Sequence, residues 1–225
     1  MVNSSKLCVY TCITGGYDKP MDFNRNQPDG VDFICFTDNP DSLSGTGWKA
    51  KPIPEELLKF SKVKQQRLIK VLPHRYLPDY DSSLWIDGNM QVLCNVGDYL
   101  KDYPLDRLSF YTRKHPSRDC IYKEGLAVVA IKRDTAENVF PQIHKYQQEG
   151  FPEHFGLHET NMVYRNHRST ECRLLCNMWA TEIIRQSHRD QLSLDYCRWK
   201  SGVEIGTLLT DRIDIDNNFR WTRHG

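Results

Sequence analysis

The sequence lacks the long apolar segments that mark membrane and secreted proteins. No apolar run in its 225 residues approaches the roughly 20 residues that a transmembrane helix needs. The stretch MVNSSKLCVYTCITGG at the start has neither a charged beginning nor a long apolar run, so it does not predict a secretion signal. We therefore expect a soluble protein of the cytoplasm, either cellular or viral and acting in a host cytoplasm.

An excess of charge of one sign is also missing. The net charge is +1, and the chain has no basic tail. This balance disfavours proteins that bind nucleic acid nonspecifically, because these usually carry a basic surface. Hydrophobic residues make up 39% of the chain and aromatic residues 11%, which is enough apolar material for a sizeable core and argues against a disordered chain.

Disulfide and zinc patterns are missing too. The eight cysteines are scattered, and without a secretion signal we expect them to be reduced thiols. Cys172 and Cys176 lie four residues apart on a predicted helix, but no second pair of cysteines or histidines has zinc spacing. A structural zinc ion is therefore not expected.

Several catalytic motifs are absent as well. The glycines near the start do not form a GxGxxG fingerprint, and no Walker A lysine follows them, so a Rossmann dehydrogenase and a P-loop enzyme are poorly supported. The GxSxG turn of a serine hydrolase does not occur, and no cysteine has a recognised nucleophile context.

The pattern that is present predicts an α/β protein. The segment 126–133 fits either a strand or the start of a helix, a loop is expected at 41–57, and the tail at 201–225 looks irregular. Strands alternating with helices predict one domain over residues 1–225, with a central, mostly parallel sheet and helices on both faces. Strands are predicted at 6–14, 31–37, 82–88, 108–113 and 158–165, and helices at 61–72, 135–150 (around Pro141), 171–186 and 189–199.

Three predicted strands end in polar, turn-forming residues. These ends are 14–18 (TGGYD), 37–39 (TDN) and 87–89 (DGN). Ligands of open α/β sheets gather beyond the carboxyl ends of the strands. If the three strands are parallel neighbours, their ends share one crevice.

Oxygen-bearing side chains at one of these ends could hold a metal ion. Asp87 and Asn89 are one residue apart and could share a hard cation such as Mg²⁺ or Mn²⁺, although a strand often ends in Asp-Gly simply in order to turn. His224 in the tail could fold back as a further ligand, or could lie free in solvent.

Two segments carry groups suited to a nucleotide. Gly15 would allow close backbone approach and Tyr17 could stack on a base, with an ordinary turn as the alternative. Arg67 and Lys70 share one face of a predicted helix, which Lys64 extends. That face could bind phosphate oxygens, or it could simply be solvated.

The remaining candidates are carboxylates and their polar neighbours. The segment 113–124 (RKHPSRDCIYKE) concentrates ionisable groups that could contact a ligand or supply a general base, unless they are only solvated. Asp at a helix start, as at 190, is often only a cap. The candidates in these segments are Arg118, Asp119, Glu124, Glu159, Asp190 and Gln191.

Seven ordered segments together resemble a known family. They are YTCITGGYD, DFICFTDNP, RLIKVLPHRYLP, SLWIDGNM, HPSRDCIYKEG, GLHETNMVYR and CNMWATEIIRQSHRDQLS. They resemble the glycosyltransferase-like family long described as a domain of unknown function, whose plant members are associated with mucilage polysaccharides and which is common in bacteria. The resemblance covers about residues 7 to 200.

This resemblance implies a GT-A-like fold and a nucleotide-sugar donor. Asp87 and Asn89 stand where GT-A enzymes have an Asp-x-Asp motif, which binds Mn²⁺ or Mg²⁺ through the donor diphosphate. The acceptor would be a hydroxyl group of a glycan, a lipid-linked sugar, a protein or a modified nucleobase, and the oligomeric state is not specified. By resemblance, Thr14, Gly15, Tyr17 and Asp38 would line the nucleoside pocket, Arg67 and Lys70 would approach the nucleotide, Arg118, Asp119 and Glu124 would face the donor sugar or the acceptor, and Glu159 with residues 189–191 would complete the sugar site.

The expected activity is transfer of a sugar from a nucleoside diphosphate to a hydroxyl group. Inversion would require a carboxylate to deprotonate the acceptor, with Asp190 as the first candidate, Glu159 as the second and Asp119 as a further one; retention would require none. Asn89 departs from the motif and brings no charge, so metal affinity should be weak. The alternatives are a binding protein without catalysis, and a metal-dependent phosphohydrolase or nucleotidyltransferase.

Overall fold

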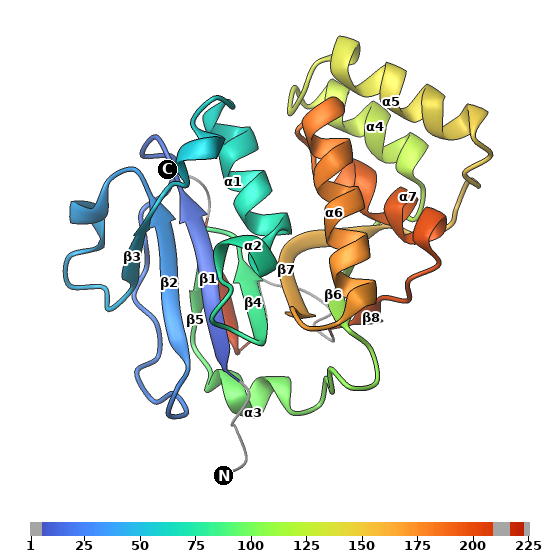
Figure 1. Ribbon diagram of the computed structural model, residues 1–225. Helices are drawn as coiled ribbons and strands as arrows, with labels where there is room; N and C mark the ends of the chain where they lie inside the picture. Colours follow the sequence, from blue (N-terminus) through green and yellow to red (C-terminus); the bar gives the residue numbers. More distant parts are fainter. Residues whose placement is uncertain (1–5, 209–216, 223–225) are drawn as a thin grey trace.

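A seven-stranded mixed sheet forms the centre of the computed structural model, which describes residues 6–208 and 217–222. Within these residues the strand order is β3-β2-β1-β4-β7-β6-β8 (Figure 1). β7 runs antiparallel to both its neighbours and the other pairs are parallel, which confirms the predicted mostly parallel sheet. The strands are β1 (Leu7–Ile13), β2 (Asp32–Thr37), β3 (Lys49–Pro52), β4 (Ser82–Ile86), β6 (Phe110–Lys114), β7 (His158–Asn166) and β8 (Gly206–Thr207).

Helices cover both faces of this sheet, and alternate residues of each strand point to opposite faces. Along β1, Cys8 and Tyr10 join one apolar cluster, while Val9 and Ile13 join the other. Because both faces are covered, this strand reads as a nearly continuous apolar run. The first cluster packs beneath α1 (Lys62–Val71), α2 (Pro73–Tyr76), α4 (Ile121–Ala130), α5 (Ala136–Gln148), α6 (Thr170–Arg185) and α7 (Gln191–Ser201).

The opposite face is covered by a smaller layer. It consists of α3 (Val96–Leu100) and a two-stranded antiparallel sheet of β5 (Met90–Val92) and β9 (Phe219–Trp221). β5 follows β4 after a short turn, so the small sheet lies next to the end of a central strand. None of the helices in the described part of the chain could cross a lipid bilayer.

Local signals explain where the main helices begin. The Ser61 hydroxyl accepts a hydrogen bond from the Lys64 amide at 3.4 Å and caps α1, and Ser169 does the same for the Cys172 amide of α6 at 3.2 Å. α5 continues through Pro141, so the predicted helix at 135–150 is correct despite that residue.

The structure differs from the secondary structure predicted from the sequence at three segments. The predicted loop at 41–57 contains β3 together with the 3-10 helices η1 (Pro40–Leu43) and η2 (Glu55–Leu57). β3 is an edge strand with little burial, so it lacks the alternation that identifies a strand. The segment 126–133 is mainly the second half of α4, and the tail predicted to be irregular includes β8 and β9, which are too short to show a period.

Candidate functional site

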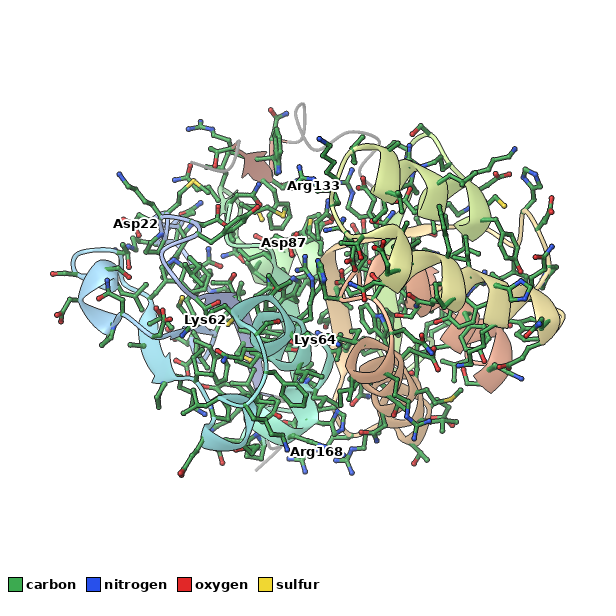
Figure 2. The ribbon with its side chains drawn as sticks, turned by 90° about the horizontal axis from the view of Figure 1, so that it is seen from above. Asp22, Lys62, Lys64, Asp87, Arg133 and Arg168 are labelled. Carbon is green, nitrogen blue, oxygen red and sulfur yellow. The ribbon has the colours of Figure 1, made fainter. Side chains whose placement is uncertain are left out.

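A cleft of about 810 Å³ lies at the carboxyl ends of β1 and β4. The chain leaves β1 toward β2 on one side while β4 lies on the other side, so the strand order reverses between β1 and β4 and a crevice opens at their ends. The volume is within the range of small-molecule sites. The walls come from the ends of β1 and β4, from α1 and β7, and from the loops around α4 and before α7. Figure 2 shows Asp87 where the sheet and the α4–α7 side of the molecule meet.

The stretch after β4 is both a turn and part of this cleft. The Met90 amide donates to the Asp87 carbonyl at 3.0 Å, which closes the turn into β5. The side chain of Asp87 lines the cleft, and its Oδ1 accepts from the Trp85 indole nitrogen at 2.8 Å. At Gly88, an added Cβ would lie 2.9 Å from the Cγ1 of Ile13, so the close approach of the β1 and β4 ends requires glycine.

A buried lysine joins the elements at the floor of the cleft. Lys70 of α1 is only 1% exposed. Its Nζ lies 2.6 Å from Asp190 Oδ2 and 3.4 Å from Asp87 Oδ1. It also donates to the Thr160 hydroxyl at 3.1 Å, and that hydroxyl donates to Asp190 Oδ2 at 2.9 Å. The ammonium thus links α1 to the ends of β4 and β7 and to the start of α7.

Asp190 is held as a carboxylate by its surroundings. Burial alone would raise the pKa of Asp190, but the charges of Arg67, Lys70 and Arg189 and the hydrogen bond from Lys70 outweigh it and hold this pKa well below its ordinary value. The Nε of Arg67 lies 3.3 Å from Asp190 Oδ1. Both oxygens of Asp190 are therefore occupied by cationic partners.

Glu159 has the opposite electrostatic setting. Burial raises the pKa of Glu159; Arg113 and a hydrogen bond from Asn161 lower it in part, and the charges of Asp87 and Glu124 raise it further. The nearest Arg113 nitrogen is 3.6 Å from its Oε2, and the side chain is 23% exposed. Glu159 is therefore a carboxylate at the cleft wall that can accept a proton more readily than an ordinary glutamate.

The loop before α4 forms a third group of charges. The Arg118 Nε donates to Glu124 Oε2, and the Arg118 Nη2 lies 3.1 Å from the Nε2 of His115. Burial, assisted by the charge of Arg118, lowers the pKa of His115 to about 4, so this imidazole is neutral at neutral pH. All three side chains line the cleft.

The structure brings most of the predicted site residues together. Those at the cleft wall are Thr14, Gly15, Tyr17, Arg67, Lys70, Asp87, Arg118, Glu124, Glu159, Asp190 and Gln191. Thr14, Gly15, Tyr17 and Asp87 meet because β1 and β4 are parallel, which places both carboxyl ends at one edge. The other residues come from α1, from α4 and the loop before it, from the start of β7 and from the start of α7.

Three other predicted residues do not line the cleft. The carboxylate of Asp38 accepts hydrogen bonds from the Gly15 amide at 3.1 Å and from Lys62 at 2.7 Å. It therefore fixes the loop after β1 without lining the cleft itself. Asp119 is exposed and bonds to His154 at 2.8 Å. Asn89 is 3% exposed, and its amide nitrogen donates to the carbonyl of residue 222 at 2.8 Å.

The predicted metal ligands do not form a divalent-cation site among the described residues. Asn89 lies away from the cleft wall, and Asp87 shares its Oδ1 with Trp85 and the Lys70 ammonium. Within residues 6–208 and 217–222, no cluster of three or more His, Cys, Asp or Glu side chains could hold a metal ion. His224 lies outside the described residues. This donor set does not fit Mn²⁺ or Mg²⁺, because a neighbouring ammonium repels a dication.

Sequence reasoning missed several residues of the cleft. Lys132 and Arg133 were placed in a segment of uncertain type, and Trp221 in a tail predicted to be irregular. Thr160 lies next to Glu159 in the predicted strand 158–165, where the sequence gives it no role of its own. A basic pair immediately after an apolar helix is a usable signal, whereas Trp221 reaches the cleft only through the pairing of β9 with β5.

Comparisons with known proteins agree with this architecture. A family model described as TOD1/MUCI70, glycosyltransferase-like domain, matches residues 1–210. The chain matches no curated protein. Among solved structures, the apo structure of WbbM, a bifunctional glycosyltransferase, is similar with a TM-score of 0.55 and 14% sequence identity. That match covers 92% of this chain but only 39% of the WbbM chain, so it shows the fold alone and confirms the predicted GT-A-like α/β class.

Proposed function

Because the chain belongs to the TOD1/MUCI70 glycosyltransferase-like domain family, we propose that it transfers a sugar from a nucleoside-diphosphate-sugar to a hydroxyl acceptor. The observation that carries this proposal is the cleft at the β1 and β4 ends, with the buried Lys70 joined to Asp87 and Asp190 at its floor.

The wall formed by β1 and α1 suits the donor nucleotide. The backbone at Gly15 is open to close approach, and the Tyr17 ring is 58% exposed at the cleft and can stack on a base. Thr14 and Arg67 border the same wall. This arrangement leaves the donor diphosphate pointing toward Asp87 and the floor of the cleft.

The charge that develops on the leaving diphosphate needs preorganised positive groups. Arg67 and Lys70 supply such groups without moving, because both are fixed by Asp190. Fixed charges of this kind stabilise a transition state without the cost of reorganising solvent. Asp190 in this scheme positions the two cations.

We assign the role of general base to Glu159, in an inverting transfer. Asp190, the first candidate from the sequence, is engaged by two cations and has a depressed pKa, so it holds protons poorly. Glu159 has a raised pKa and lines the cleft beside Asn161. A base with a raised pKa is better matched to removing a proton from a hydroxyl near neutral pH.

A screen of nucleotide-sugars by thermal shift, followed by a turnover assay, tests the proposal. A donor that binds the folded state raises the melting temperature by mass action. We expect release of nucleoside diphosphate from that donor. We expect Asp87→Ala to lower this turnover about 10- to 100-fold, because Asp87 helps to fix the Lys70 ammonium.

The exposed Asp102 gives a matched control, and Asp102→Ala should keep full activity. Unchanged turnover in folded Asp87→Ala protein would remove Asp87 from the mechanism. Binding without turnover would instead support a binding protein without catalysis. Release of nucleoside monophosphate would point to a phosphohydrolase or nucleotidyltransferase.

A further inference from the structure

The charges at the cleft floor already neutralise one another. Lys70 and Arg67 lie within ion-pair distance of Asp190, and Lys70 also lies near Asp87. Two cations therefore face two carboxylates, so Arg67 and Lys70 offer fixed cationic groups to a phosphate oxygen while the floor as a whole carries no net positive charge. A ligand with two or more negative charges must find its compensating charge elsewhere in the cleft.

Cations that take part in none of these ion pairs also line the cleft. The cleft is lined by seven Lys or Arg residues and five Asp or Glu residues, so its wall has a positive surplus. Lys132, Arg133 and Arg189 line it, and among the ion pairs of the described residues none includes any of these three. The Nε of Arg189 is buried without a hydrogen-bond partner.

The nearest carboxylates are occupied by other groups. Asp134 follows Arg133 directly, but its Oδ1 accepts from the Thr135 amide at 2.7 Å and from Asn138 at 2.8 Å. Its Oδ2 accepts from the Ser187 hydroxyl and lies 3.2 Å from the His188 ring. This carboxylate therefore binds the start of α5 and the loop before α7, and leaves Arg133 unpaired.

Like charges are also gathered close to one another. Burial and the charges of Arg67 and Arg133 lower the pKa of Arg189, while Asp190 and Glu124 raise it in part. Guanidinium groups brought within electrostatic reach repel one another, and a bound anion relieves that repulsion. Figure 2 shows Arg133 and Asp87 in the region where the two sides of the molecule meet, and both residues line the cleft.

The backbone at Lys132 is held in an unusual conformation. Its φ is +57°, in the left-handed region that disfavours residues with a Cβ. The Lys132 amide donates to the Val129 carbonyl at 3.0 Å and the Arg133 amide to the Val128 carbonyl at 2.9 Å, which is the Schellman ending of α4. Glycine is the usual residue at this position, so the conformation costs a lysine free energy that a glycine would not lose.

We propose that Lys132, Arg133 and Arg189 form an anion site that binds the donor diphosphate, so that the protein's own cations replace a divalent metal ion. The inference rests on the proposed function for the identity of the ligand, but the anion site is defined by these residues alone. It also accounts for a cleft floor whose residues do not fit Mn²⁺ or Mg²⁺.

Binding of inorganic pyrophosphate and of the nucleoside diphosphate found in the screen tests the site, measured by calorimetry with excess EDTA. Wild-type protein should bind both. Arg133→Ala should raise each Kd at least about tenfold, because it removes a charge-assisted hydrogen bond to a phosphate. The Kd of the nucleoside without phosphate should not change.

Two further variants separate the ligand role from a structural one. Lys132→Gly should raise both Kd values while the melting temperature stays the same or rises, because glycine suits the left-handed position. Lys123→Ala, on the same helix but away from the cleft wall, should change neither property.

Strict dependence of diphosphate binding on Mg²⁺ or Mn²⁺ overturns the inference, as do unchanged Kd values in Arg133→Ala. If Arg133→Ala and Lys132→Gly both turn over a nucleotide-sugar at the wild-type KM, the anion site is rejected and the proposed function stands. If the wild-type protein binds pyrophosphate but turns over no nucleotide-sugar, the anion site stands and the proposed function is rejected.

Discussion

Replacement of Glu159 by glutamine is expected to lower kcat about 10²- to 10⁴-fold, the usual contribution of a general base. Glutamine keeps the size of the side chain and its polar contacts with Arg113 and Asn161, so the fold should not change. A stopped or continuous assay of nucleoside diphosphate release with saturating donor measures the effect.

The pH profile gives this prediction a second readout. Burial raises the pKa of Glu159 above its ordinary value of 4.5, and a base acts only when deprotonated. The wild-type rate should therefore fall as pH decreases through that raised pKa, and this acidic limb should be absent in Glu159→Gln. Glu153→Gln, at an exposed position, should retain both the rate and the limb. A wild-type rate in Glu159→Gln would return the role of base to Asp190.

Replacement of Asp190 by asparagine is expected to lower the free energy of unfolding by about 3–5 kcal/mol, as is typical when one partner of a buried ion pair is removed. The side chain of Asp190 is 3% exposed and that of Lys70 is 1% exposed, so the remaining ammonium cannot be solvated. Urea unfolding at neutral pH measures the change.

Two comparisons show whether burial of the pair is the cause. The double variant Lys70→Met, Asp190→Leu should recover part of the lost stability while remaining inactive, because it replaces the Lys70–Asp190 pair with apolar groups of similar volume but leaves Arg67 without its partner. Glu149→Gln removes a partly exposed pair with Lys200 and should cost no more than about 1 kcal/mol. A loss of that small size in Asp190→Asn would show that the buried pair does not stabilise the fold.

The sequence predicts the parts of the fold that depend on local pattern. β1, β2 and β4 are apolar runs that end in polar turns, and their parallel pairing then brings Thr14, Gly15 and Asp87 to one cleft. The same reasoning misplaces Asp38, because its carboxylate turns back to the Gly15 amide. Strand ends predict which loops meet, and the direction of each side chain depends on contacts made after they meet.

The parts that were not predicted depend on contacts between distant residues. Lys70 shares a face with Arg67 in the sequence, and helical spacing alone makes that face look solvated. It is buried because Asp190, far along the chain, balances its charge. In the same way, Asn89 is turned from the cleft by a hydrogen bond to a residue 133 positions away. No local pattern encodes such a pairing.

The floor of the cleft also links recognition of the substrate to the completeness of the tertiary structure. Lys70, Asp87, Thr160 and Asp190 belong to four different segments, and each lacks its neighbours until all four have docked. A partly folded chain therefore lacks the arrangement that binds the donor. The amount of donor bound should then measure the fraction of fully folded molecules, and it should be lost in a single cooperative step on unfolding.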